Sequence, residues 1–493
     1  MDYKPVTGVW EITMGCNMRC KHCGSSCTTP LEDELTTGEA LALCDDIADL
    51  GLKWITLSGG EPLTRKDWPQ LVERLRNNGV IPNIITNGWM CDEQAVLQGK
   101  EAGVGTFAIS LDGMPDTHDY MRKKGSFERT AKAFQLMAEN DISSGAITTV
   151  STKNMPELPA LKKKLVELGV RYWQLQIGLP MGNFEHTPQM IMAPEDVDQV
   201  IDFIYSAADD DRITIYPADC IGYYSHKELA SRQKAHKAAS PPVWRGCNAG
   251  KRSLGILHNG EILGCTSIRN REFIEGSIRE RSLREIWEDE KAFLWSRTLK
   301  KAELEGQCKT CQYGELCLGG CPNTRLTMTG KIHSENEFCS YNVALKKTQQ
   351  LVAPIDDVAE LLATARNLTM KGEFQLAALS LERAMEIEPE NIDVLQLHGY
   401  VSFSLNNLEE CRKSNQQVLD IDAENVYANK GLGLALHRLG DSDGGISYLQ
   451  KAVALASEDD TDPYHDLAAV YMETGQRDKA EALLKGAKLL VVA

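Results

Sequence analysis

The chain has 493 residues, of which 42% are hydrophobic and 25% are charged, a composition typical of a globular protein too long to fold around one ordinary core. No stretch approaches about 20 uninterrupted apolar residues, so the sequence argues against a membrane protein and favours a cytoplasmic one. The 53 basic and 70 acidic residues give a net charge of −17, which argues against nucleic acid and anionic membrane as partners.

From Val9 to about Ile177 the sequence alternates short β-rich runs with longer amphipathic segments. Strands are predicted at residues 9–14, 53–58, 81–86, 105–111, 143–150 and 171–177. Helices are predicted near residues 35–50, 66–79, 92–102, 127–140, 156–168 and 194–208. Six βα units predict a parallel sheet that curls toward a barrel, with ligands bound at the carboxyl ends of its strands.

Eleven of the fifteen cysteines fall into two groups, between residues 16 and 27 and between 247 and 339. In a reducing compartment, clustered cysteines favour metal binding over disulfides. Cys16, Cys20 and Cys23 follow the first predicted strand with the spacing C-x3-C-x2-C. Three thiolates on one loop can hold three corners of an iron–sulfur cubane and leave the fourth iron free for a substrate. Taken alone, such a trio also fits half of a zinc site.

The ends of the following strands carry the residue types that a nucleoside-like cofactor needs. Gly59 and Gly60 let the backbone approach a ligand closely. The next two residues are Glu61 and Pro62, and the Glu61 carboxylate can pair with a cationic amine. Groups suited to ribose or methionyl polar atoms end the third and fourth strands: Asn87, Ser110 and Asp112. Arg122 is a further candidate for a cofactor contact, whereas His118 fits a surface or helix-start position better than a catalytic one. Weaker candidates for contacts with cofactor or substrate are Thr148, Ser151, Gln174 and Gln176.

The order and placement of these motifs resemble the radical S-adenosylmethionine (SAM) superfamily. The resemblance implies a partial (β/α)6 barrel in which the first three cysteines hold a [4Fe–4S] cluster and residues 59–62 bind the amine of SAM. An electron from the cluster would then cleave SAM to a 5′-deoxyadenosyl radical. The segment from Ser110 to Phe127 is similar to the branch that contains sulfatase maturases and peptide-modifying enzymes. There Arg122 either pairs with the carboxylate of SAM or forms a plain salt bridge.

The second cysteine group consists of Cys247, Cys265, Cys308, Cys311, Cys317, Cys321 and Cys339. A single C-x2-C pair would also fit a zinc ribbon, but these seven spacings resemble the signature of the SPASM domain, which holds two auxiliary [4Fe–4S] clusters. The resemblance implies an outer cluster on Cys308, Cys311, Cys317 and Cys339. It implies an inner cluster on Cys247, Cys265 and Cys321.

Two departures from the sulfatase-maturase pattern bear on the chemistry. No cysteine shortly precedes Cys247, so the inner cluster either takes Cys220 as its fourth ligand or keeps an open iron. Cys220 could instead donate a hydrogen atom to a substrate radical, or be a buried structural cysteine. Thr266 follows Cys265 where the maturases have an acidic proton acceptor, so a sulfatase maturase is not expected.

After Tyr341 the sequence repeats itself. Small or turn-forming residues recur at intervals of 34, 34 and 35 residues, at Gly372, Asn406, Gly440 and Gly475, and a second set follows the same period, at Ala384, Val418, Ala452 and Ala487. This helix–turn–helix period resembles tetratricopeptide repeats, and four repeats fit. Such an all-α solenoid presents a concave groove to peptides or proteins, although it can also serve oligomerisation or act as a spacer.

Charge is concentrated in this repeat region. From Asp356 onward there are 24 acidic and 12 basic residues, so the region carries −12 of the net −17. Such acidity makes a basic peptide or protein surface a plausible partner, although the same charges also occur on helices simply to solvate them.

The sequence therefore predicts an α/β partial barrel at residues 1–225, an auxiliary iron–sulfur domain at 226–345 and helical repeats at 346–493. The leading hypothesis is a radical SAM enzyme with three [4Fe–4S] clusters, reduced by a flavodoxin or ferredoxin. It would modify a ribosomally made peptide or protein by crosslinking, thioether formation or epimerisation. The alternative is radical oxidation or decarboxylation of a small molecule, such as a haem precursor or a sugar, with the repeats recruiting a partner. A non-enzymatic assembly scaffold is disfavoured, because the cluster motif is intact.

Overall fold

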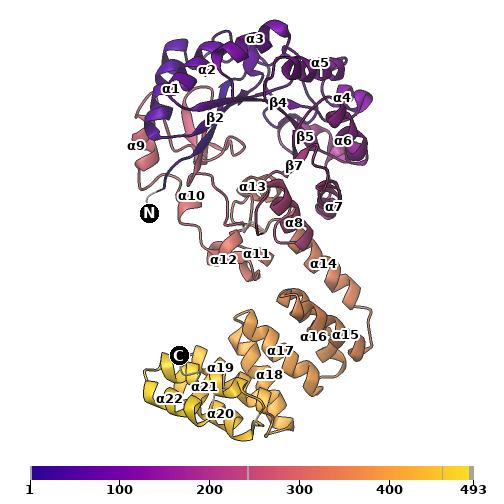
Figure 1. Ribbon diagram of the computed structural model, residues 1–493, viewed down its shortest axis with the longest axis vertical. Coiled ribbons are helices and arrows are strands. Elements are labelled where there is room, and N and C mark those ends of the chain that lie inside the picture. Colours follow the sequence, from indigo (N-terminus) through magenta and orange to yellow (C-terminus); the bar gives the residue numbers. More distant parts are fainter. Residues whose placement is uncertain (1–2, 241–243, 458, 488–493) are drawn as a thin grey trace. The chain divides into compact units, whose positions relative to one another are not determined.

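The computed structural model describes residues 3–240, 244–457 and 459–487 (Figure 1). The chain divides into two compact units, Met1–Val343 and Ala344–Ala493. Among the described residues, no helix combines the length and apolar character needed to cross a membrane.

The first unit is built on a parallel sheet whose first six strands confirm the prediction: β1 (Thr7–Thr13), β2 (Trp54–Gly59), β3 (Ile81–Thr86), β4 (Thr106–Ser110), β5 (Ser144–Val150) and β6 (Tyr172–Ile177). The predicted helices are confirmed as α1 (Thr37–Leu50), α2 (Trp68–Asn77), α3 (Glu93–Ala102), α5 (Ser126–Glu139), α6 (Leu158–Glu167) and α7 (Val197–Ala207). A further helix, α4 (Pro115–Met121), follows β4. Figure 1 shows α1 to α6 along the outer side of the sheet.

Local sequence explains where these elements begin and end. In α1, the Thr36 side chain accepts a hydrogen bond from the Glu39 N–H while the Glu39 carboxylate accepts one from Thr36, which is a complete capping box. Gly51 then ends the helix in the left-handed conformation, at φ 94°. Along β1, Trp10 and Ile12 are wholly buried and belong to the core between the sheet and its helices. Alternation along each strand therefore directs the intervening side chains to the inner face.

Four short strands extend the sheet beyond the prediction: β7 (Thr214–Pro217), β8 (Ser253–Ile256), β9 (Glu261–Leu263) and β10 (Gly276–Ser277). The strand order is β10-β9-β8-β1-β2-β3-β4-β5-β6-β7, and β8 pairs with β1 in parallel. The cysteine-rich segment thus shares one sheet with the barrel. The division between residues 225 and 226 lies within the first unit and stays a prediction.

The cysteine-rich part is otherwise made of short helices and loops. Its helices are α8 (His226–Ala235), α9 (Leu283–Glu288), α10 (Leu294–Arg297), α11 (Gly306–Thr310), α12 (Gly314–Cys317), α13 (Pro322–Thr329) and α14 (Ser340–Val352). Short helices leave many turns, which lets cysteines that are distant in sequence converge.

The second unit confirms the helical repeats. Its helices are α15 (Val358–Met370), α16 (Phe374–Ile387), α17 (Ile392–Ser404), α18 (Leu408–Ile421), α19 (Val426–Arg438), α20 (Ser442–Leu455), α21 (Asp462–Glu473) and α22 (Arg477–Gly486). The periodic residues Gly372, Asn406, Gly440 and Gly475 join the two helices of each pair, all with φ between 59° and 102°. In the second periodic set, Ala384, Val418 and Ala452 are wholly buried where helices pack, whereas Ala487, just after α22, is only half-buried.

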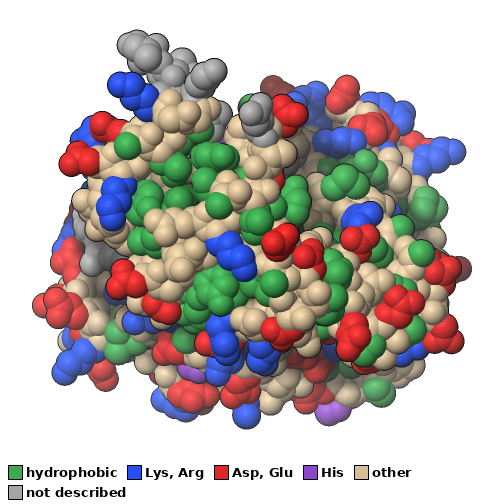
Figure 2. Space-filling model, turned by 90° about the horizontal axis from the view of Figure 1, so that it is seen from below, with side chains coloured by type: hydrophobic (Ala, Val, Ile, Leu, Met, Phe, Trp, Pro, Cys, Tyr) green, Lys and Arg blue, Asp and Glu red, His purple; other side chains and the backbone are tan. Residues whose placement is uncertain are grey.

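Acidic side chains do not form one continuous field on the face seen in Figure 2. They are interspersed there with Lys, Arg and apolar groups.

Candidate functional site

The loop that carries Cys16, Cys20 and Cys23 lies directly beyond β1, at the carboxyl edge of the sheet. Backbone hydrogen bonds hold both of its ends: the Cys16 N–H donates to Thr28 at 2.9 Å, and the Lys21 N–H donates to Met121 at 2.8 Å. The loop therefore has a fixed shape on the barrel rim.

Gly59 and Gly60 make room for this loop. Gly59 has φ 129°, and a Cβ atom there would lie 2.2 Å from the Thr13 carbonyl oxygen. A Cβ atom on Gly60 would lie 2.2 Å from the carbonyl oxygen of Gly15, the residue before the first cysteine. The sequence predicts that these glycines let the backbone approach a ligand. In the structure they lie against the chain's own backbone at the start of the cysteine loop.

Glu61 joins the ends of β2 and β3. Its wholly buried carboxylate accepts hydrogen bonds from Leu63 N (3.2 Å), Thr86 Oγ1 (2.7 Å) and Asn87 N (2.7 Å). The Asn87 side chain then donates to Asn17 Oδ1 at 2.7 Å, inside the cysteine loop. Pro62 begins the short turn Pro62–Thr64 that follows. Burial raises the pKa of Glu61, and these donors oppose that rise.

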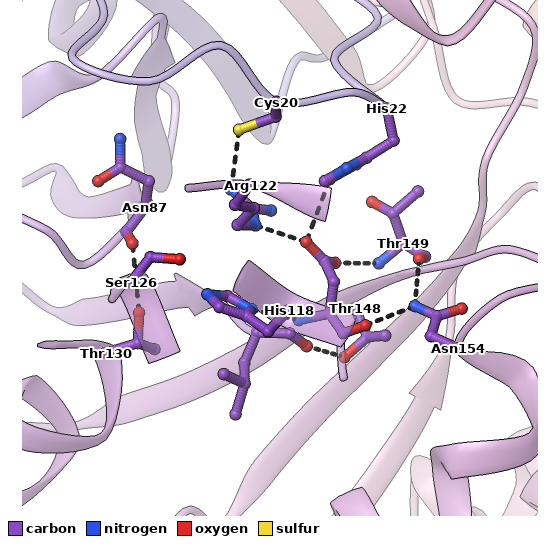
Figure 3. Close-up of polar contacts among 12 residues, drawn as sticks. Cys20, His22, Asn87, His118, Arg122, Ser126, Thr130, Thr148, Thr149 and Asn154 are labelled. Carbon is purple, nitrogen blue, oxygen red and sulfur yellow. Dashed lines mark hydrogen bonds and ion pairs between the residues drawn. The ribbon is translucent and has the colours of Figure 1, made fainter. Parts of the chain in front are cut away.

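Arg122 lies among the polar side chains behind the loop (Figure 3), where it pairs with Asp112. The wholly buried Asp112 carboxylate accepts from Arg122 Nε at 2.5 Å, lies 3.1 Å from His22 Nε2, and accepts from the Thr149 N–H at 2.9 Å. Burial alone would raise the pKa of Asp112, but Arg122 and His22 hold it well below its usual value. Arg122 Nη1 also lies 3.9 Å from Cys20 Sγ, so one guanidinium links Asp112 to the cysteine loop.

The weaker candidates from the sequence take mainly structural places. His118 Nδ1 accepts from the Asp112 N–H at 3.0 Å, and burial lowers the pKa of His118 to about 4, so the ring is neutral at pH 7. Thr148 donates to Leu111 O and accepts from Trp173 Nε1, and Ser151 bonds to Asn154. Ser110, at the end of β4, is 9% exposed.

Gln174 and Gln176 project from β6 into different surroundings. Gln176 donates to Thr149 Oγ1 at 3.0 Å. Gln174 lines a pocket of about 330 Å³ on the inner face of the sheet, together with Thr56, Asn83 and Tyr172. All of the residues lining this pocket are uncharged, so it suits hydroxyl and amide groups better than a carboxylate.

The outer set of SPASM-like cysteines shares one pocket. Cys308, Cys311, Cys317 and Cys339 line it, and all four side chains are buried. An aromatic wall stands beside them: Tyr224 stacks on Tyr313 with ring centroids 4.3 Å apart, and Tyr313 contacts Tyr341 edge-on at 4.9 Å. Such a wall keeps water from the sulfur atoms.

The inner set also converges. Cys321 lies close to Cys247 and helps to raise the pKa of the Cys247 thiol. Cys265 likewise lies close to Cys321 and helps to raise the pKa of the Cys321 thiol. Cys220 joins them: burial, and then the neighbouring Cys321, raise the pKa of Cys220 to about 12. The Tyr223 hydroxyl accepts from the Cys321 N–H at 2.8 Å and donates to the Asp219 carbonyl, which ties these segments together.

The donors in both sets are thiols, the side chains that bind iron–sulfur clusters. A cubane takes its ligands at separate corners, so three or four thiolates around a shared space suffice. Among the described residues, no group of three or more Cys, His, Asp or Glu side chains is placed to hold a single metal ion.

Two residues of these networks were not predicted. His22 lies within the cysteine motif itself, and Asp219 directly precedes Cys220. Their proximity to motif cysteines was the sequence signal: His22 pairs with Asp112, which is distant in sequence, and the Asp219 carbonyl accepts from Tyr223, four residues on.

Comparison with known proteins gives three family matches in order along the chain. The radical SAM superfamily matches residues 10–165, the SPASM iron–sulfur cluster-binding domain matches 247–312, and a tetratricopeptide repeat matches 429–459. An AdoMet-dependent heme synthase of Methanosarcina barkeri is 30% identical, over 70% of this chain and 99% of that protein. A PqqA peptide cyclase of Granulibacter bethesdensis is 25% identical, over 71% of this chain and 91% of that protein.

Two solved structures share the fold. Streptococcus suis SuiB bound to S-adenosylmethionine is 15% identical with a TM-score of 0.54, over 67% of this chain and 76% of that one. Native anSMEcpe with bound AdoMet is 18% identical with a TM-score of 0.55, over 70% of this chain and 98% of that one. The chain belongs to the radical SAM superfamily, with radical SAM, SPASM iron–sulfur and tetratricopeptide-repeat regions in that order.

Proposed function

We propose that this chain is an oxidative radical SAM enzyme that modifies a ribosomally made peptide or protein. The observation that supports the proposal is that all ten predicted ligand cysteines lie in one compact unit, where four line one pocket and the others have neighbouring thiols. When bound, SAM and the first cluster supply a 5′-deoxyadenosyl radical that can take a hydrogen atom from an unactivated carbon. The modification would be a crosslink, a thioether or an epimerisation of the peptide or protein.

In this proposal the residues around the first cysteine set hold the loop rather than react. Gly60 lets the loop cross the end of β2, and Glu61 fixes the adjoining turn through its buried hydrogen bonds. Asp112 anchors Arg122, whose Nη1 then donates toward Cys20. Gly59, Pro62, Asn87 and Ser110 complete the rim at which SAM would be held.

Cys220 is proposed as the fourth ligand of the inner cluster. Its nearness to Cys321 and its anchoring by the Ile177 N–H at 3.4 Å support this role over that of a free hydrogen donor. Iron analysis of Cys220→Ala decides: loss of iron makes Cys220 a ligand, whereas full iron content with an altered product makes it a hydrogen donor.

The repeats are proposed to hold the polypeptide. A groove of about 630 Å³ in the second unit is lined by the exposed rings of Tyr400 and Tyr427, by Phe403, and by polar groups that include Asn415. Exposed aromatic rings beside amide groups suit an extended peptide.

A haem precursor is the second candidate substrate. Curated relatives named AdoMet-dependent heme synthase are 27–30% identical, and an Fe-coproporphyrin III synthase is 28% identical. Around the cysteine loop, Lys21 and Lys153 flank the Tyr120 ring, and Lys123 and Arg129 flank the Trp89 ring. These cations could pair with the propionates of a tetrapyrrole.

The test uses the full chain, reconstituted under anaerobic conditions and reduced chemically or by a flavodoxin or ferredoxin. The wild type should form 5′-deoxyadenosine from SAM, and Cys20→Ala should not. The wild type and a Tyr400→Ala/Tyr427→Ala variant are then used to capture peptides from cell extract. A peptide that is retained only by the wild type and gains a modification with SAM supports the proposal. Turnover of Fe-coproporphyrin III by both proteins, with no peptide modified, overturns the peptide assignment.

A further inference from the structure

Arg325, on α13, is among the largest wholly buried side chains, with 1% of its surface exposed. Its Nη2 atom lies 3.4 Å from the Leu318 carbonyl oxygen, but Nε and Nη1 have no hydrogen-bond partner in the part of the chain that the structure describes. An arginine cannot lose its charge, so this is a buried cation with two unused donors.

Two other arginines of the first unit with little exposed surface have partners in the chain. Arg232 pairs with Glu228 and donates to the carbonyls of Pro217, Ala218 and Ile221. Arg122 pairs with Asp112. Because a buried unpaired charge strongly destabilises a fold, Arg325 requires an anion, which no carboxylate among the described residues provides.

The groups that surround Arg325 identify that anion. Its guanidinium lies against residues 318 and 319: Nη2 donates to the Leu318 carbonyl oxygen, and a Cβ atom on Gly319 would touch Cζ. These two residues lie between Cys317, of the outer cysteine set, and Cys321, of the inner set. Arg325 therefore stands between the two proposed auxiliary cluster sites.

The backbone beside Arg325 is shaped to admit it. A Cβ atom on Gly319 would lie 3.0 Å from Arg325 Cζ, and Gly319 has φ 77°. Leu318, which precedes it, also has a positive φ of 50°. A positive φ costs free energy for Leu318 but not for Gly319, and this backbone turn makes room for the guanidinium beside the segment that joins Cys317 to Cys321.

We infer that Arg325 is the counter-ion of both auxiliary clusters and holds their reduction potentials at higher values. A thiolate-ligated cluster gains negative charge when it accepts an electron, and a fixed cation that donates hydrogen bonds to its sulfur atoms favours that reduced state. The Nε and Nη1 donors are the groups that would make these bonds. Arg325 is a positioning and charge-balancing residue, and it takes no part in bond making.

The first test measures potentials rather than activity. In a full-length Cys16→Ala/Cys20→Ala/Cys23→Ala background, only the auxiliary clusters remain. Arg325→Met should retain their iron and shift at least one midpoint potential to a more negative value in an EPR-monitored titration. Arg325→Lys, which keeps the charge, should shift it less. Arg297→Met is the matched control, because Arg297 bonds to the carbonyls of Gly250 and Trp287.

The second test covers the case in which Arg325→Met loads poorly. Thermal unfolding of the full chain is compared with clusters present and after chelation. With clusters present, Arg325→Met should unfold at a lower temperature than the wild type. Without them it should unfold at a higher temperature, because an uncompensated buried charge has been removed. Arg297→Met should lower the unfolding temperature in both states.

The inference rests on the auxiliary clusters of the proposed function, and the two can fail separately. If the cysteine-substituted background holds no iron, the auxiliary clusters themselves are absent and both ideas fall. If it holds iron but Arg325→Met leaves both potentials unchanged at full loading, or shifts stability in the same direction with and without clusters, Arg325 is not their counter-ion.

Discussion

Arg269 and Glu11 lie 258 residues apart in sequence and form an ion pair in the structure. Glu11, on β1, is 4% exposed, and Arg269 also donates to Ser25 Oγ at 2.6 Å, just beyond the cysteine loop. One guanidinium thus joins the cysteine-rich segment to the first strand and to the loop. The pair supports the site mechanically, since Glu11 shares its strand with the start of that loop.

Removing Arg269 should leave a buried carboxylate unpaired. Arg269→Met is expected to lower the free energy of unfolding by about 2–3 kcal/mol, less than the ~3–5 of a wholly buried pair, because Arg269 is 26% exposed. Chemical denaturation measures the change. Arg271→Met is the control, since Arg271 is 88% exposed and lies 3.6 Å from Glu261. An equal loss in both variants would contradict this role.

The cost of Arg269→Met should also depend on pH. Burial raises the pKa of Glu11, and Arg269 opposes that rise, so the variant raises it further. Between about pH 4 and 7, Glu11 loses its proton readily in the unfolded variant but keeps it in the folded one. The free energy of unfolding of the variant, relative to wild type, should therefore fall as pH rises through this range. Unfolding curves at several pH values test this. A pH-independent difference would exclude Glu11 as the cause.

Breaking the Asp112–Arg122 pair should affect the first cluster more than the auxiliary ones. Arg122→Met leaves Asp112 buried without its cation and removes the donor to Cys20, so 5′-deoxyadenosine formation should fall at least about tenfold and stability by about 3 kcal/mol. Adding Asp112→Asn should restore much of the stability and none of the SAM cleavage. Recovery of both would mean that Arg122 acts only through Asp112.

Gly60→Ala should disturb the cysteine loop directly. The new methyl group would lie 2.2 Å from the Gly15 carbonyl oxygen, a distance that backbone must move to relieve. We expect loss of the first cluster, seen as about four fewer irons per chain, with the auxiliary clusters kept. Gly38→Ala, on α1 with open space around the new Cβ, should keep all iron and be neutral or stabilising by up to about 1 kcal/mol.

The count of three clusters can be checked by removing one cysteine from each set. Cys20→Ala, Cys308→Ala and Cys247→Ala should each remove about four of about twelve irons. Cys44→Ala is the control, because Cys44 is buried in the core of α1 and contacts the Leu71 carbonyl. Simultaneous loss of eight irons in Cys308→Ala would mean that the two auxiliary sites assemble as one.

Local pattern was enough to predict much of this protein from its sequence. The period-two strands β1 to β6, the helices between them and the 34-residue repeat follow from residue spacing, because the burial of alternate side chains in a strand or of one helix face depends mainly on neighbours in sequence. The ligand cysteines were predicted for the same reason, since cluster chemistry constrains their intervals. Their roles as ligands stay predictions.

Only the tertiary structure decided the rest. Strands β8 to β10 are two to four residues long, too short for a periodic signal, and exist because β1 offers an edge to pair with. The pairs Asp112–His22 and Glu11–Arg269, and the place of Arg325 between two cysteine sets, depend on segments brought together by folding. A charged side chain shows its sign in the sequence, but its partner and its burial, which set its energy, are properties of the folded chain.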